Sequence, residues 1–222
     1  SLGKVYKEAG LGHYMSPIIR QRFPGPDFSQ FMGAEMIAEK HKLSKDQLDR
    51  FSLLSHQRAR AATLEGAFKA EVVPIDVRLP DGSGGEQHVA DEGIRMEATL
   101  EGIASVKTLR EGGYISAANA SQICDGASGV MVVNEKGLKA LGVKPLARIH
   151  HMTVIGGDPV IMLEAPLPAT THALKKAGMK IDDIDLFEVN EAFASVPLAW
   201  LLHTGADPAK LNVNGGAISL GH

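Results

Sequence analysis

With 222 residues, of which 44% are hydrophobic and 22% charged, the chain can bury a sizeable core and is too apolar for a disordered protein. Its net charge of -3 offers no positive field to nucleic acid or to anionic membranes, and no apolar run approaches the roughly 20 residues that span a bilayer. The single cysteine excludes an internal disulfide framework, and the first residues lack the apolar core of a signal peptide. We therefore expect a cytoplasmic protein whose partners are neither nucleic acids nor membranes.

The first part of the chain predicts loops followed by two helices. Residues 1–28 are interrupted by Gly and Pro and indicate loop or extended structure. Helices are predicted over 31–42 and 43–66, and the second has a capping box between Ser44 and Gln47. Apolar residues at helical spacing give this second helix one packing face. The side that carries His56, Arg58 and Arg60 is expected to face solvent.

A strand is predicted over 71–77, ahead of the glycine-rich segment "PDGSGGE" at 80–86. Glycines can cradle a phosphate, but no Lys-Ser or Lys-Thr pair and no helix start follow these. We therefore interpret 80–86 as a plain turn.

From about residue 113 the sequence alternates between β-branched runs and helical patterns. The predicted strands are 114–121, 129–134, 146–156, 185–190 and 211–214. The predicted helices are 135–141, 168–179 and 191–205. This alternation favours βαβ units, so the expected fold class is α/β with a mostly parallel sheet and helices packed on its faces. Ligands of such sheets bind beyond the carboxyl ends of the strands.

Two of those strand ends carry polar side chains: Asn190 in "VNEAF" and His222 in "VNGGAISLGH". Asn190 could cap the following helix or hold a water for a ligand. The glycine pair before His222 lets the backbone approach another strand or a substrate. Each residue alone can be structural. Together they could polarise a carbonyl oxygen and stabilise an enolate or a tetrahedral oxyanion.

Other candidate residues are interpreted as structural. Cys124 has no basic neighbour in sequence to favour its thiolate, and a thiol among small apolar residues is usually a packing group. His150 and His151 are adjacent on a predicted strand, so their side chains would point to opposite faces and could not bind one metal. No other set of His, Asp or Glu has ligand spacing, and no metal site is predicted.

Four segments, in order, resemble signature blocks of the thiolase family. They are "YISAANASQICDGASGVMV" at 114–132, "GGDPVIMLEAPLPA" at 156–169, "NEAFA" at 190–194 and "NVNGGAISLGH" at 212–222. The family fold is a pair of related βαβαβαββ domains with a loop domain inserted in the first. The resemblance therefore implies a partial thiolase fold.

In that fold, residues 1–113 resemble most of the loop domain. Residues 114–140 resemble the end of the first domain, and 141–222 the first part of the second. The resemblance also implies that the chain is cut at both ends, because the nucleophilic Cys and the second reactive Cys of the family have no counterpart in it.

The activity that the resemblance implies is acyl transfer through a Cys acyl-enzyme. A 3-ketoacyl-CoA is cleaved to acetyl-CoA and a shortened acyl-CoA, or the reverse Claisen condensation occurs. By position, His222 would activate the nucleophile and donate a hydrogen bond in one oxyanion hole. Asn190 would hold the water that completes this hole.

Coenzyme A enters this reaction as a substrate, and no permanently bound cofactor is expected. Ser121 resembles the residue that meets the pantetheine arm, and Ala117 lies in the same block. Arg95 in "DEGIR" would lie against the adenine end, and Phe193 would pack near the acyl group.

The branch of the family is suggested by Phe31, which precedes Met32 and Gly33 where the biosynthetic acetoacetyl-CoA branch tends to have His. This difference favours the degradative 3-ketoacyl-CoA branch. Full-length thiolases are typically homodimers or homotetramers. The alternative is a catalytically inactive CoA-binding remnant, since the nucleophile is missing from these 222 residues.

Overall fold

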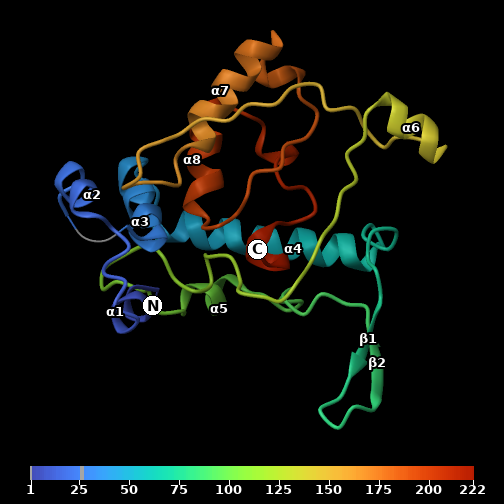
Figure 1. Ribbon diagram of the computed structural model, residues 1–222, viewed down its shortest axis with the longest axis horizontal. Coiled ribbons are helices and arrows are strands. Elements are labelled where there is room, and N and C mark those ends of the chain that lie inside the picture. The colour runs from blue at the N-terminus through green and yellow to red at the C-terminus, as the bar shows by residue number, and fades with distance from the viewer. Residues whose placement is uncertain (1, 26–27) are drawn as a thin grey trace.

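The computed structural model describes residues 2–25 and 28–222 (Figure 1). A long helix, α4 (Lys45–Leu64), crosses its middle and contacts α5 (Leu100–Ala104), α8 (Ser195–Thr204) and α9 (Ala217–Leu220). Helix α8 in turn contacts α3 (Gln30–Lys40) and α7 (Pro166–Ala177). The core lies between these helices, and its largest fully buried apolar side chains are Ile37, Leu48, Ile115, Leu211 and Ile218.

Both helices predicted in the first part are confirmed, as α3 and α4. The capping box of α4 forms as predicted: the Gln47 amide N–H donates to Ser44 Oγ over 3.2 Å, and the Ser44 N–H donates to Gln47 Oε1 over 2.8 Å. Two of the four free N–H groups at the start of the helix are thereby satisfied near its first turn. Gly66 follows the helix with a φ of 76°.

Loop or extended structure was expected over residues 1–28. This expectation is wrong in two places, where the structure has short helices: α1 (Leu2–Glu8) and α2 (Pro17–Arg22). Helix α2 has a local cause. Ser16 Oγ accepts the Ile19 N–H, and Pro17 stands at the first helical position, where its fixed φ suits a helix. We interpreted Pro17 from the sequence as a residue that interrupts helices and did not recognise that it begins one.

A two-stranded antiparallel hairpin projects from the body of the structure (Figure 1). It consists of β1 (Ile75–Arg78) and β2 (Gly84–His88), so only the end of the predicted strand 71–77 is regular. The first part of the glycine-rich segment 80–86 forms the turn, as predicted, and residues 84–86 belong to β2. Asp81 closes the turn by accepting from the Ser83 N–H and hydroxyl. Every residue of both strands is exposed.

The predicted parallel sheet is not formed by the residues that the structure describes. Segments 129–134 and 146–156 form no ladder and run around the outside as single lengths of chain (Figure 1). Segments 114–121, 185–190 and 211–214 contribute only isolated bridges, two of them parallel, between Phe187 and Leu211 and between Val213 and Gly215. Strand propensity needs a neighbouring strand to accept its hydrogen bonds, and these runs find none here. Their apolar side chains are accordingly exposed, with Val130 at 89% and Val154 at 96%.

Helices in the second half agree with the sequence more closely. The helix predicted over 135–141 is α6 (Glu135–Leu141), and α7 ends at Gly178 in a left-handed conformation with a φ of 68°. Helix α8 begins at Ser195, four residues later than predicted. Two 3-10 turns complete the secondary structure, η1 (Ile181–Asp183) and η2 (Pro208–Lys210). None of the helices over residues 2–25 and 28–222 is long and apolar enough to cross a membrane.

Candidate active site

The two polar residues predicted at neighbouring strand ends meet in the structure. Asn190 Nδ2 lies 2.9 Å from His222 Nδ1, and both side chains are exposed. An amide nitrogen can only donate, so Nδ1 accepts and the proton of the neutral imidazole lies on Nε2. The pair thus presents one ring N–H donor at an open surface, which is the group needed to stabilise a developing oxyanion.

Asn190 is placed by the chain segments on either side of it. The Phe187 N–H donates to Lys210 O and the Asn212 N–H donates to Phe187 O, each over 2.9 Å, which forms the parallel bridge between Phe187 and Leu211. The buried Asn212 amide then continues this pairing: its Oδ1 accepts the Val189 N–H over 2.9 Å, and its Nδ2 donates to Val189 O over 2.8 Å. The Asn212 side chain therefore provides Val189 with the two hydrogen bonds that a neighbouring strand would otherwise make.

His222 is placed by the glycine pair and by α9. Gly215 has a φ of 86°, and a Cβ on it would lie 2.7 Å from the Cβ of Ala59 in α4. A Cβ on Gly216 would lie 2.6 and 2.7 Å from the carboxylate oxygens of Glu191. The sequence left open whether these glycines admit another strand or a substrate. The structure gives a third answer, since they admit helix α4 and a buried carboxylate.

The predicted CoA-binding block lies against the Asn190 segment. Ala120 and Phe193 form an antiparallel bridge, in which the Ser121 N–H donates to Ala192 O and the Ala194 N–H donates to Asn119 O, each over 2.9 Å. Ser121 is half-buried and Ala117 is exposed.

This pairing also explains why α8 starts late. The residues just ahead of it are held in the bridge and cannot form a first helical turn.

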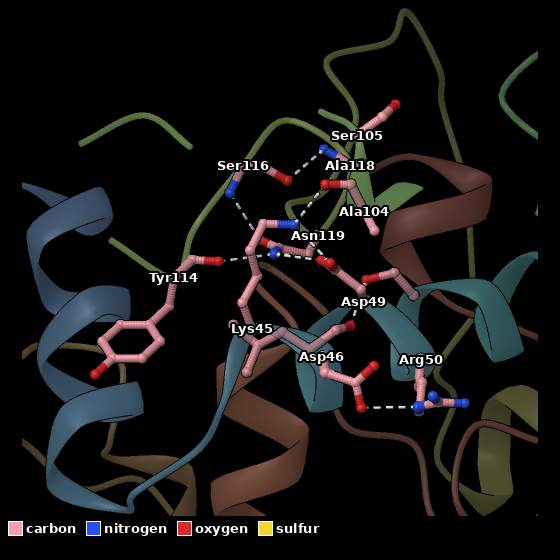
Figure 2. A network of polar contacts seen from close by, with 12 residues as sticks. Lys45, Asp46, Asp49, Arg50, Ala104, Ser105, Tyr114, Ser116, Ala118 and Asn119 are labelled. Carbon is pink, nitrogen blue, oxygen red and sulfur yellow. Dashed lines mark hydrogen bonds and ion pairs between the residues drawn. The ribbon is translucent and has the colours of Figure 1, made fainter. Parts of the chain in front are cut away.

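A buried polar network holds that block against α4 (Figure 2). Asp49 is 2% exposed and accepts from Lys45 Nζ and, over 3.1 Å, from Asn119 Nδ2. Asn119 also donates to Tyr114 O and accepts the Ser116 N–H, each over 2.9 Å. Every polar atom of its amide thus has a partner, and the turn at 114–119 is fixed in one conformation.

Phe193 is 4% exposed, and its ring packs edge to face on Phe31 with centroids 5.5 Å apart. Phe31 itself is 53% exposed at the start of α3. The residue that suggested the degradative branch therefore contacts the residue predicted to lie near the acyl group.

Arg95 is exposed and lies next to the same region. Its N–H donates to the buried His56 Nδ1 over 3.1 Å, and its guanidinium reaches Gln122 Oε1 at 3.4 Å. Burial, together with the charge of Arg95, lowers the pKa of His56. The expectation that His56 faces solvent is therefore wrong, because the 93–95 loop covers this side of α4.

Gln122 was not identified from the sequence as a functional candidate, yet it joins the loop at 93–95 to the end of α9. Its Nε2 donates to Gly93 O over 2.7 Å and to Ile218 O over 2.8 Å. A lone glutamine in a small-residue segment carries no signal for such contacts, since both partners are distant in sequence.

A cavity of about 640 Å³ lies beside His222. Its lining includes Cys124, Asp91, Glu92 and Gln122. Cys124 is exposed, and its sulfur lies so close to Gly221 that a Cβ there would collide with it. Among the described residues, no group of three or more His, Cys, Asp or Glu is arranged to hold a metal ion.

The structure thus brings together most of the residues that the sequence singled out as site candidates. Asn190 and His222 form one group, and Ser121 and Phe193 join it through the antiparallel bridge. Arg95 reaches this assembly through Gln122. Their roles toward a ligand remain predictions.

Comparison with known families assigns this fold. The family description "Thiolase, N-terminal domain" matches residues 27–136, and "Thiolase, C-terminal domain" matches residues 143–222. The chain belongs to the thiolase family. The finer division at residues 113 and 140 stays a prediction.

Among curated proteins, the chain is similar to the steroid 3-ketoacyl-CoA thiolase FadA6 of Mycobacterium tuberculosis, with 50% identity over 201 residues. That match covers 90% of this chain and 48% of the relative. The 3-ketoacyl-CoA thiolase of Bacillus subtilis is 38% identical over 224 residues, which cover 96% of this chain and 57% of the relative. The chain thus spans about half the length of the relatives it matches.

Solved structures agree. The crystal structure of human mitochondrial 3-ketoacyl-CoA thiolase in complex with CoA superposes with a TM-score of 0.77 at 41% identity, over 86% of this chain and 47% of that one. The Bacillus anthracis acetyl-CoA acetyltransferase gives a TM-score of 0.79 at 34% identity, over 90% of this chain and 50% of that one. The predicted partial thiolase fold is confirmed.

Proposed function

We propose that this chain supplies the Asn–His part of a thiolase active site, in which CoA cleaves a 3-ketoacyl-CoA to acetyl-CoA and a shortened acyl-CoA. The hydrogen bond of 2.9 Å between Asn190 and His222 carries the proposal, because it pairs an oxyanion donor with a group that fixes its tautomer. The names of the relatives support the substrate class. The reverse Claisen condensation would use the same groups.

The reaction needs a cysteine thiolate, which we place in the part of the protein outside these 222 residues. The thiol proton passes to Nδ1 of His222, for which the hydrogen bond from Asn190 to that nitrogen must open; the thiolate then attacks the 3-keto carbon, and the C2–C3 bond breaks. The electron pair of that bond becomes the enolate of acetyl-CoA, which takes the proton at C2. The thiol of a second CoA then attacks the acyl-cysteine, and its proton returns to the cysteine sulfur. Asn190 and His222 stabilise the oxyanions that form.

CoA binding belongs to the same proposal. Ser121 and Ala117 would meet the pantetheine arm, and Arg95 would lie against the adenine end. Phe193 would hold the wall of the acyl pocket through Phe31, whose ring is exposed next to it. The human relative whose title includes CoA supports this ligand.

The test is thiolysis of acetoacetyl-CoA by the protein that contains this chain. Asn190→Ala and His222→Asn should each lower kcat by about 10²- to 10³-fold, because each removes part of an oxyanion hole. The matched control is His172→Asn, since His172 is exposed on α7. Full activity in either site variant would contradict the proposal. CoA binding without turnover by the wild type would support the non-catalytic alternative.

A homodimer or homotetramer is the proposed assembly of the full protein. Light scattering of the purified protein should give two or four subunit masses, and a monomer at micromolar concentration would contradict this part of the proposal.

A further inference from the structure

We propose that Glu191 is a positioning residue of this site, whose buried carboxylate holds the Asn190 turn and the α9–His222 turn in fixed relation to each other. The inference rests on the proposed function for its kinetic consequence. Glu191 directly follows Asn190 and is 1% exposed, so it cannot contact a ligand at the surface. Its effect on the reaction must pass through the residues that it binds.

The carboxylate of Glu191 accepts three hydrogen bonds from three separate parts of the chain. The Ser55 hydroxyl of α4 donates to Oε2 over 2.6 Å, and the Ile218 N–H of α9 donates to the same oxygen over 3.2 Å. Asn212 Nδ2 donates to Oε1 over 2.9 Å. Hydrogen bonds to an ionised group are about twice as strong as neutral ones, so this carboxylate is a firm junction.

Two of these bonds lead to the catalytic candidates. Asn212 holds Val189 through both of its amide atoms, so Asn190 stands between two residues that share one anchor. Ile218 belongs to the short helix that ends at Leu220, two residues before His222. The hydrogen bond between Asn190 and His222 therefore closes a ring of contacts in which Glu191 is the common member.

The charge of the group matters as well as its shape, because the three partners all donate to it. The Asn212 amide cannot rotate to present its oxygen to Glu191, since Val189 fixes both ends of that amide. A glutamine at position 191 would replace one acceptor oxygen by an NH2 group. This group would face one of the donors, and two donors cannot form a hydrogen bond. The substitution Glu191→Gln thus keeps the volume and breaks one side of the junction.

The decisive experiment compares Glu191→Gln with Glu35→Gln in the protein that contains this chain. Glu35 is a matched control: it is 3% exposed and accepts the N–H groups of Tyr114 and Ile115, and its partners lie outside 187–191 and α9. Both variants lose a buried charge and should lower the thermal midpoint. Only Glu191→Gln should lower kcat for acetoacetyl-CoA thiolysis, by about 10²-fold, because a displacement of about 1 Å in a catalytic group costs that much. Its KM for CoA should change less than kcat.

A second readout does not depend on thiolase activity. In 15N-histidine-labelled protein, the Nδ1 resonance of His222 reports whether the ring accepts the Asn190 hydrogen bond. We expect the signal to move in Glu191→Gln and to stay in place in Glu35→Gln. If Glu191→Gln fails to fold, Ser55→Ala, which removes one donor and keeps the carboxylate, should give the same two effects at smaller size.

The outcomes separate the two proposals. An inactive wild-type protein whose His222 signal still moves in Glu191→Gln would end the proposed thiolase activity and keep the positioning role. An active wild type with kcat in Glu191→Gln within twofold of Glu35→Gln, and with an unmoved His222 signal, would overturn the role of Glu191.

Discussion

Gly216 gives the sharpest test of the packing beneath the site. A Cβ at this position would lie 2.6 and 2.7 Å from the two oxygens of Glu191, whereas ordinary contacts begin near 3.4 Å. In Gly216→Ala, either α9 moves away from α4 or the carboxylate leaves its partners. Overpacking of a core costs about 1 to 3 kcal/mol, and a lost hydrogen bond to a charged group about 1.5 to 3 kcal/mol. Since one of these two changes occurs, we expect the free energy of unfolding to fall by about 1 to 3 kcal/mol.

The assay is urea unfolding followed by circular dichroism, with Gly84→Ala as the control. Gly84 lies on the exposed hairpin, and a Cβ there meets nothing within 4 Å. The control should change stability by less than about 0.5 kcal/mol, as surface substitutions usually do. A Gly216→Ala variant as stable as Gly84→Ala would refute the close approach of the glycine pair to Glu191.

Three further predictions concern other parts of the structure. Ser44→Ala should cost about 1 kcal/mol in urea unfolding, because it removes the cap of α4, and no loss would contradict the capping box. His56 has a lowered pKa in the folded state, so its contribution to stability is complete above the unfolded value of about 6.5 and is lost as the pH falls below it. Thermal midpoints between pH 7.5 and 5 should fall less in His56→Gln than in wild type, and equal slopes would refute this. Cys124→Ser should keep thiolysis within about threefold, because the proposed nucleophile lies outside these 222 residues, whereas a loss of the acyl-enzyme would make the exposed Cys124 the nucleophile.

The helices could be predicted because their ends depend on residues close in sequence. Ser44 and Gln47 are three positions apart, and Gly178 ends α7 through its own backbone conformation. The strands could not be predicted to the same degree, because a ladder needs a partner segment. The run at 129–134 has the composition of a strand and remains without a ladder in the described part of the chain.

The site shows the same division. Asn190 and His222 could be predicted because the ends of neighbouring strands meet at one edge, and a single bridge is enough to bring them together. The role of Glu191 could not, since an acidic residue at the start of a predicted helix is ordinarily a favourable partner of the helix dipole. Its burial follows from Ser55, which lies 136 positions away in the sequence.

The contacts of Arg58 in α4 show how this distance in sequence affects the order in which the site folds. Its guanidinium donates to the carbonyl oxygens of Leu211, Asn212 and Pro208, as the N–H groups of an adjacent strand would. The ribosome adds the 153 positions between Arg58 and Leu211 in roughly 8 to 30 s, and α4 can be complete long before. We expect the candidate site around Asn190, α9 and His222 to become native after α4, so in pulse-labelled hydrogen exchange the Ile218 amide should gain protection after the amides of α4. Simultaneous protection would contradict this order, because it would show that α4 becomes native only together with its partner segment.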